Sequence, residues 1–334
     1  MAVVQELLPP FITASAGLGL LLFSANYLVV GAVSLARRLG WSKLIIGLTV
    51  VAFGTSAPEF VTVLAAALEE APAMAVGNVV GSNLANMLLI LGVAAAIRPI
   101  ACAPRVVKRD GVAVLLATVL FIALGFAQGL TSLHAIILLV VWLAYLTWSY
   151  YAERNLANQG GAVHVMGAEE VTGVPPQLWV AGLMVSGGLV GLVVGAELLV
   201  RGGIQIARLA GVSEAAIGLT LIAVGTSLPE LATVAVASWR AHGDVVIGNI
   251  LGSNIFNLLA VAGGVASITP LPVPKQILFF DVWAMLAVTA LMLPIMITGH
   301  RVSRPEGGGL LVLYGGYVFV QFSPIREILG FTSV

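Results

Sequence analysis

The sequence predicts an all-α membrane protein of ten transmembrane helices, arranged as two five-helix repeats of inverted topology. Composition is the first reason: 60% of the 334 residues are hydrophobic and only 9% are charged, whereas a soluble domain has about 25% charged residues. The other two reasons are the recurrence of long apolar segments and a match between the two halves of the chain.

Ten apolar segments approach the length of about 20 residues that a helix needs to cross a bilayer. The first is interpreted as a membrane helix, because its apolar stretch from about Leu8 to Leu35 is longer than that of a cleaved signal peptide. The expected spans are residues 8–36, 43–69, 72–97, 108–127, 131–152, 177–207, 214–239, 245–268, 276–298 and 308–323.

One long polar interval separates two groups of five spans. It contains several charged and amide residues and a Pro-Pro pair, a composition typical of a loop. We therefore expect residues 1–153 to form the first five-helix repeat, residues 154–176 a cytoplasmic linker, and residues 177–334 the second five-helix repeat.

The positions of Lys and Arg relative to the expected helix ends predict the orientation. If both termini lie outside, eleven basic residues face the cytoplasm and only Arg201, Arg208, Lys275 and Arg326 are external. We therefore expect a multi-pass protein of the cell membrane with both termini outside. The cytoplasmic residues are then Arg37, Arg38, Lys43, Arg98, Arg105, Lys108, Arg109, Arg154, Arg240, Arg301 and Arg304.

The strongest signal is an internal repeat with an offset of 171 residues, which carries Glu59 onto Glu230. Each half contains an odd number of expected spans, so the second half enters the membrane from the opposite side. This is the inverted-repeat architecture of secondary transporters, which bind their substrates where the repeats meet. The matching motifs are Gly-Thr-Ser-x-Pro-Glu at 54–59 and 225–230, and Gly-Asn-x-x-Gly-Ser-Asn-x-x-Asn at 77–86 and 248–257.

Composition and spacing also exclude several function classes. Cys102 is the single cysteine, and no Cys/His group has the spacing of a zinc or iron–sulfur site. The 15 basic and 15 acidic residues balance, and no basic run is dense enough to follow a nucleic-acid backbone. An intramembrane enzyme would need a metal site with His or a nucleophile beside a base. The sequence indicates neither, nor an organic cofactor or an obligate protein partner.

Glu59 and Glu230 are the candidate ion-binding carboxylates. Each lies about sixteen residues into an expected span, where an uncompensated charge costs several kcal/mol. No Lys or Arg lies in the central part of any span, which leaves a bound cation or a proton as the compensating charge. Two protonated, hydrogen-bonded glutamates are the alternative, but both repeat positions would then have to be incidental.

Oxygen-bearing residues accompany both glutamates. Thr55 and Ser56 precede Glu59 by four and three positions, so a helix can place these oxygens on one side, and Thr226 and Ser227 repeat the pattern. A proline before each glutamate disrupts the helix and frees a carbonyl four residues earlier. Hard cations bind such carboxylate, hydroxyl and carbonyl oxygens.

The second motif adds hydroxyls and amides. Ser82 and Asn86 are four residues apart and share a helix face, as do Ser253 and Asn257. The glycines of this motif weaken the helix and allow another backbone to come close. Together the two motifs predict a cation site between the halves.

Other charges in or near the spans have simpler explanations. Glu197 and Arg201 are four residues apart on one expected helix and should form an ion pair. Asp110 and Asp281 match under the repeat offset and begin their helices, so we expect them to cap helix N-termini.

With both motifs in both halves, the sequence resembles the cation/Ca²⁺ exchanger superfamily, and within it the prokaryotic Na⁺/Ca²⁺ exchanger branch. The resemblance covers nearly the whole chain. It implies that the second, third, seventh and eighth spans surround a cluster of cation sites, while the first span of each half slides against this core to alternate access. The H⁺/Ca²⁺ exchanger branch is less similar, because it has glutamate where this sequence has Gly81 and Gly252.

The resemblance also implies a ligand for each motif position. The glutamates of the two Gly-Thr-Ser motifs would bind Ca²⁺ with the carbonyls of Thr55 and Thr226. Asn86 corresponds to an amide of the family core, whereas Asn257 stands where the best-understood Na⁺/Ca²⁺ exchangers have aspartate. Na⁺ would use the same glutamates with Ala52, Ser56, Ser82, Ala223, Ser227 and Ser253.

The function expected from these residues is secondary active exchange of Ca²⁺ for Na⁺ across the membrane. A transporter of the same fold that exchanges Ca²⁺ for H⁺, depends on K⁺ or carries Mg²⁺ is an alternative. A passive cation channel is a second alternative, which fits a polar interface between repeats but does not require inverted halves.

Overall fold

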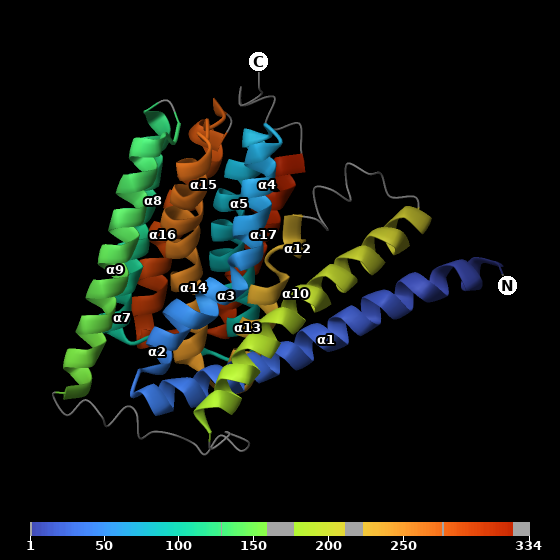
Figure 1. Cartoon of the computed structure of the whole chain (residues 1–334), viewed down its shortest axis with the longest axis horizontal. Helices are drawn as coiled ribbons and strands as arrows, with labels where there is room; N and C mark the ends of the chain where they lie inside the picture. The colour runs from blue at the N-terminus through green and yellow to red at the C-terminus, as the bar shows by residue number, and fades with distance from the viewer. Residues whose placement is uncertain (1, 128, 159–176, 211–222, 276, 323–334) are drawn as a thin grey trace.

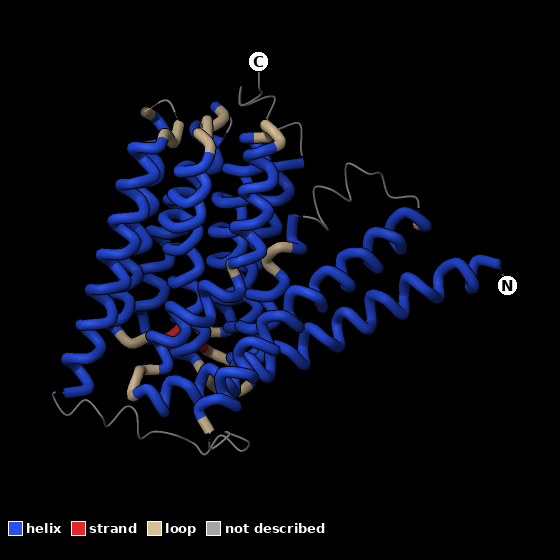
Figure 2. The backbone as a smooth tube through the Cα atoms, in the orientation of Figure 1, coloured by secondary structure: helices blue, strands red, loops and turns tan. Residues whose placement is uncertain are grey.

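The computed structural model describes residues 2–127, 129–158, 177–210, 223–275 and 277–322. This part of the chain is almost entirely helical, with one short two-stranded sheet (Figures 1 and 2). Strand β1 (Ile100–Ala101) pairs antiparallel with β2 (Arg301–Val302), and so joins segments from the two halves of the chain.

The helices of the first half begin with the long α1 and continue through three interrupted spans. Several of the interruptions are π-helical turns, labelled η. The elements are α1 (Ala2–Leu39), α2 (Lys43–Ile46), η1 (Gly47–Val51), α3 (Ala52–Thr55), α4 (Ala57–Leu68), α5 (Pro72–Ala85), η2 (Asn86–Ile90), α6 (Leu91–Ile97), α7 (Pro104–Val106), η3 (Val107–Gly111), α8 (Val112–Phe126) and α9 (Ser132–Asn158).

The second half repeats this order where the structure describes it. A π-helical turn again follows the helix that carries the Gly-Asn motif. The elements are α10 (Leu178–Leu209), α12 (Ala223–Gly225), α13 (Leu228–Trp239), α14 (Gly243–Ile255), η6 (Phe256–Val261), α15 (Ala262–Ile268), η7 (Ile277–Asp281), α16 (Val282–Ile297), the 3₁₀ turn η8 (Thr298–His300) and α17 (Arg304–Phe322).

Within the described residues, seven helical segments are long and apolar enough to cross a membrane. The segments Lys43–Thr55 and Ala57–Leu68 also meet these criteria when taken together, and they are bent by 41° at their junction, as in a broken span or a re-entrant loop. The expected span at 214–239 begins in residues that the structure does not describe. Helix α17 lies where the last span is expected, but its glycines and its first-turn charges, Arg304 and Glu306, lower its hydropathy.

Helices α1 and α10 lie side by side and tilt away from the other helices (Figure 1). Glycines bring the two backbones together: a Cβ at Gly202 of α10 would lie 2.5 Å from the backbone nitrogen of Ala14, and one at Gly195 would lie 2.7 Å from that of Leu21. Buried apolar side chains of this pair also pack on Ala232 of α13. The pair is therefore a closely packed unit against one side of the bundle.

The centre of the bundle is the segment from α14 to α15, whose most apolar stretch is completely buried. It packs closely on the first half, because a Cβ at Gly248 would lie 2.6 Å from the carbonyl oxygen of Leu44 and one at Gly252 would lie 2.7 Å from that of Leu48. The motif glycines here permit backbone contact between α14 and the span that starts with α2, as the sequence predicts for this motif.

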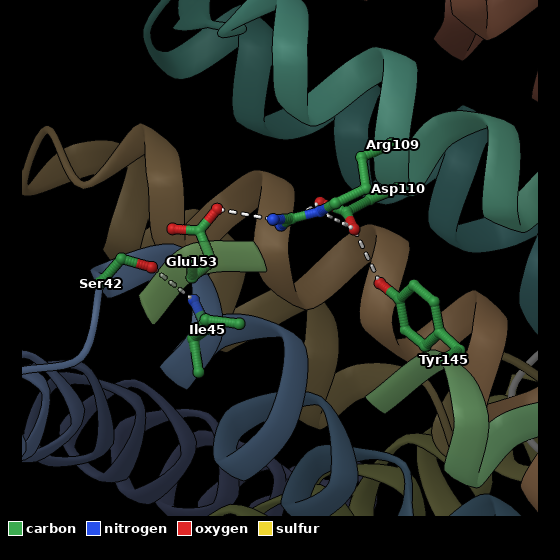
Figure 3. A network of polar contacts seen from close by, with 6 residues as sticks. All are labelled: Ser42, Ile45, Arg109, Asp110, Tyr145 and Glu153. Carbon is green, nitrogen blue, oxygen red and sulfur yellow. Dashed lines mark hydrogen bonds and ion pairs between the residues drawn. The ribbon is translucent and has the colours of Figure 1, made fainter. Parts of the chain in front are cut away.

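The expectation that Asp110 caps a helix is wrong. Asp110 lies inside the π-helical turn η3 and makes no capping hydrogen bond. Its carboxylate instead pairs with the Arg109 guanidinium at 2.8 Å and accepts a hydrogen bond from the Tyr145 hydroxyl at 3.0 Å (Figure 3). Arg109 also pairs with Glu153 at 2.7 Å, so the network joins η3 to α9. At this buried position the carboxylate forms a charge-assisted pair with a guanidinium group instead of accepting a hydrogen bond from a backbone N–H.

Asp281 in the second half bonds to neutral side chains and also does not cap α16. Its carboxylate accepts hydrogen bonds from the Tyr317 hydroxyl, at 3.0 Å, and from the Gln321 amide, so it joins η7 to α17 and makes no capping hydrogen bond. By contrast, the expected ion pair between Glu197 and Arg201 is present on the exposed face of α10.

Candidate cation site

Both candidate glutamates lie one turn after a break in their helices. The break falls at Ser56 between α3 and α4, where φ is −88° and ψ is 6°, and at Ser227 between α12 and α13, where φ is −91° and ψ is 5°. A proline occupies one of the first two positions after each break, where its missing N–H costs nothing. Glu59 and Glu230 therefore lie in first turns, where the free N–H groups and the helix dipole favour a negative charge.

The two halves exchange hydrogen bonds at these glutamates. The Ser56 hydroxyl donates to Oε1 of Glu230 at 2.8 Å, and the Ser227 hydroxyl donates to Oε1 of Glu59 at 3.4 Å. The spacing within each motif predicts oxygens on one side of a helix, and the structure adds that each serine hydroxyl bonds to the glutamate of the other half. Because the helix breaks at the serine, its hydroxyl turns toward the glutamate of the other half.

The threonines make a second pair of contacts between the halves. The Thr55 hydroxyl donates to Oδ1 of Asn249 at 3.3 Å, and Asn78 Nδ2 lies 3.5 Å from the Thr226 hydroxyl. Asn249 Oδ1 also accepts from the Ser253 hydroxyl at 3.2 Å. Asn78 and Asn249 were not predicted as site residues, although both belong to the Gly-Asn motif and could have been identified by their matching repeat positions.

The remaining amides are arranged unequally. Asn86 Nδ2 donates to Oδ1 of Asn254 at 3.2 Å, which again joins the halves. The equivalent bond by repeat position would join Asn257 to Asn83, but Asn83 Nδ2 donates to the carbonyl of Val79 on its own helix at 2.7 Å. Neither amide atom of Asn257, which is 1% exposed, has a hydrogen-bond partner. Asn257 is thus a buried amide with two free polar atoms beside the site motifs.

Two π-helical turns orient these amides. Asn86 is the first residue of η2, and Asn257 is the second residue of η6. An inserted residue in a helical turn changes the direction of the side chains around it, and such turns are frequent at functional sites. The Asn86 N–H still bonds to the carbonyl of Ser82 four residues earlier, so these two residues keep the helical spacing that the sequence predicts, and the turn widens after Asn86.

The other candidate ligands lie in the same region. Ser82 and Ser253 are buried. The carbonyl of Ala52 accepts the Ser56 N–H at 3.0 Å and lies 3.4 Å from the Thr55 hydroxyl, so its oxygen lies beside the break. Ala223 begins α12, and only its backbone is described.

The site has two buried carboxylates and no cationic side chain paired with them. Glu59 and Glu230 are each 1% exposed, and the Oε2 atom of each has no hydrogen-bond partner. The ion pairs found within the described ranges involve Arg109 and Arg201, not these glutamates. Buried charges without a partner are strongly unfavourable, so an ionised pair of these glutamates requires a compensating cation or proton at the free oxygens.

The donor set indicates which kind of cation. Among the residues the structure covers, no three His, Cys, Asp or Glu side chains gather as a metal site. Carboxylate, hydroxyl, amide and carbonyl oxygens surround the two glutamates instead, and this is the chemistry of hard cations such as Ca²⁺.

Known proteins are similar to this chain over almost its whole length. CaxA of Alkalimonas amylolytica is 38% identical over 312 residues, which cover 92% of this chain and 97% of CaxA. The sodium/calcium exchanger MaX1 of Methanosarcina acetivorans is 32% identical, with 93% and 98% covered. A solved structure of the sodium-calcium exchanger NCX_Mj, soaked with Na⁺ and Sr²⁺, superposes with a TM-score of 0.79 at 29% identity, and covers 94% of this chain and 98% of NCX_Mj.

A family model described as sodium/calcium exchanger protein matches residues 10–151 and 180–323. These two segments include both glutamates, both helix breaks and both Gly-Asn motifs. The chain therefore belongs to the sodium/calcium exchanger protein family.

Proposed function

We propose that this protein is a secondary active antiporter that exchanges Ca²⁺ for Na⁺ across the cell membrane by alternating access. As a member of its family it is a transporter and not an enzyme. The observation that carries the proposal is the pair of buried glutamates, each bonded through one oxygen to a serine of the other half and left with the other oxygen free.

The proposed Ca²⁺ ligands are Glu59, Glu230 and the carbonyls of Thr55 and Thr226. Two carboxylates balance one divalent cation, and the helix breaks leave backbone oxygens beside them. When Ca²⁺ leaves, Na⁺ replaces it on the same glutamates, with oxygens of Ala52, Ser56, Ser82, Ala223, Ser227 and Ser253. Asn86 and Asn257 complete the polar lining.

The architecture proposed with this function has ten spans in two inverted repeats. Residues 1–153 form one repeat, residues 154–176 a cytoplasmic linker and residues 177–334 the other, with both termini outside. The contacts between Ser56 and Glu230 and between Ser227 and Glu59 support this proposal, because each connects equivalent positions in a reciprocal way. The closely packed pair of α1 and α10 would then slide against the remaining helices to open the site to either side.

Uptake of ⁴⁵Ca²⁺ into proteoliposomes tests the proposal. Vesicles are loaded with Na⁺, with K⁺ or with a proton gradient, and we expect rapid uptake only from an outward Na⁺ gradient. Uptake that follows the proton or K⁺ gradient would assign a different counter-ion to the same site. Uptake that persists without any counter-ion gradient would contradict exchange and indicate a channel.

A further inference from the structure

Four basic side chains gather at one end of the bundle, away from the cation site. Arg37 lies in the last turn of α1 and Lys43 begins α2. Arg240 ends α13, and His242 immediately precedes α14. Helices α1 and α14 each contact both α2 and α13, so these four elements lie together. We call these four residues the basic cluster.

The cluster connects α1 to the central helices. Arg240 Nε donates a hydrogen bond to Oδ1 of Asn26 on α1 at 2.7 Å, so the turn between α13 and α14 is tied directly to that helix. The neighbouring Trp239 is 78% exposed. An exposed tryptophan next to arginine at a helix end is typical of the headgroup level of a bilayer.

Two polar groups of the cluster have no partner. His242 is 6% exposed, and its Nε2 atom makes no hydrogen bond. Nη2 of Arg37 is also buried without an acceptor. Within the described parts of the chain, Arg37, Arg240 and His242 form no ion pair. Buried donors without acceptors cost about 1–3 kcal/mol each, and more when charged, so these atoms indicate a missing acceptor.

The electrostatic environment of His242 supports an anion as that acceptor. Burial, followed by the positive charges of Lys43, Arg240 and Arg37, lowers the pKa of His242 to about 4. The imidazole is therefore neutral at pH 7 and can still donate one N–H. Asp244, in the first turn of α14, is exposed to solvent. Three positive side chains thus surround a buried ring that is itself neutral at pH 7.

We propose that the basic cluster binds a phosphate group, which an anionic phospholipid supplies at the membrane surface. Arginine guanidinium groups and a neutral imidazole N–H are suitable donors to phosphate oxygens. The lipid is favoured over a soluble phosphate because the cluster lies beside an exposed tryptophan and because anionic leaflets attract basic residues at this depth. Bound there, the phosphate would link Arg37 of α1 to the turn that carries Arg240 and His242.

Thermal unfolding of the full-length protein in nanodiscs tests this site without measuring transport, so its failure is separate from failure of the proposed exchange. The Tm is measured in phosphatidylcholine alone and with phosphatidylglycerol added. We expect the anionic lipid to raise the Tm of the wild type. Arg37→Gln, Arg240→Gln and His242→Gln should each weaken lipid affinity about fivefold, which corresponds to about 1 kcal/mol. The Tm increase should shrink accordingly.

Arg98→Gln is the matched control, because Arg98 is an exposed arginine at the end of α6, outside the cluster. It removes the same charge and should keep the full Tm increase. An equal reduction in all four variants would overturn the proposal and show only diffuse attraction. The proposal is also overturned if the three cluster variants lower the Tm by the same amount in neutral lipid. The cluster side chains would then bind groups of the protein and not a lipid phosphate.

Inorganic phosphate in neutral nanodiscs distinguishes the source of the phosphate. If it raises the Tm of the wild type and not of Arg37→Gln, the phosphate site is upheld but its ligand is soluble. If it has no effect while phosphatidylglycerol acts through the cluster, the lipid assignment is upheld. No effect of either phosphate source on the wild type overturns the proposal.

Discussion

Among the described residues, Glu59 and Glu230 are the acidic side chains with a buried carboxylate oxygen that has no hydrogen-bond partner. We expect Glu59→Gln and Glu230→Gln each to abolish Ca²⁺ transport while the protein stays folded, because each removes one of the two charges that balance the ion. Glu197→Gln, a carboxylate in an exposed ion pair, is the control and should retain flux. Flux assays and Tm values on all three check this, and near-normal flux in either site variant would contradict the assignment.

The serine hydroxyls of the second motif should contribute more to Na⁺-driven exchange than to Ca²⁺ binding. We expect Ser82→Ala and Ser253→Ala to reduce Na⁺-driven exchange more than Ca²⁺ binding, because hydroxyls are proposed as ligands of Na⁺ and not of Ca²⁺. Binding of Ca²⁺ and exchange rate are measured on the same preparation. Ser238→Ala serves as control, because its buried hydroxyl donates to the carbonyl of Ala94 outside the motifs. Equal loss of binding and exchange would argue against separate Na⁺ ligands.

His242 should make the stability of the fold depend on pH. Its pKa is lowered to about 4 in the folded protein but is about 6.5 when unfolded. The unfolded chain therefore takes up the proton first, and stability is full above pH 6.5 and falls as the pH drops toward 4, by up to about 1.4 kcal/mol per unit. Tm measured against pH should fall less steeply in His242→Gln, and parallel curves would show that His242 does not contribute.

At the scale of residues, the sequence identified the two buried glutamates as candidates but did not predict which side chains bond to them. Glu59 and Glu230 could be identified because charge in an apolar span requires compensation. The bond from Ser56 to Glu230 could not, because helical spacing places Ser56 beside Glu59 until a break turns it away. The position of such a turn depends on tertiary contacts that no local pattern records.

At the scale of elements, the close contact of α1 with α10 depends on glycine. Gly202→Ala would place a methyl group 2.5 Å from the backbone of Ala14, and overpacking of this kind costs about 1–3 kcal/mol. We expect a lower Tm. Gly182→Ala, on the same helix but with no atom within 4 Å of the added Cβ, should leave the Tm unchanged or raise it. If the two variants behave alike, the α1–α10 contact is not limited by glycine.

The π-helical turns and the short β1–β2 pair are elements that the sequence did not predict. Hydrophobic periodicity identifies a long apolar segment as a helix, and α5 with η2 reads as a single span. The π-helical turn that begins at Asn86 changes the hydrophobic period only slightly. Such a change cannot be detected from the sequence in a segment whose side chains are apolar on all faces. The same holds for η6, where Asn257 lies. Broken helices with motif prolines were predictable, because proline acts locally.

For the whole molecule, the matching halves were predictable from the sequence alone, but their difference in structure was not. Equivalent residues make equivalent contacts at the glutamates and threonines, yet Asn254 bonds to Asn86 while Asn83 bonds to its own helix. Identical motifs cannot encode such a difference. An inverted-repeat transporter that faces one side at a time must have unequal halves, and the two conformations exchange when access alternates.

The amides should therefore control which side the site faces. In the opposite state, the proposed exchange mechanism pairs Asn83 with Asn257 and returns Asn254 to its own helix. Asn86→Ala removes a bond of the present state, whereas Asn257→Ala removes a bond of the opposite one. A buried hydrogen bond is worth about 1 kcal/mol, so each variant should shift the two populations about fivefold. The ratio of apparent Ca²⁺ affinities on the two faces of oriented vesicles should move in opposite directions, and a shift of the same sign in both would show that these amides do not exchange partners.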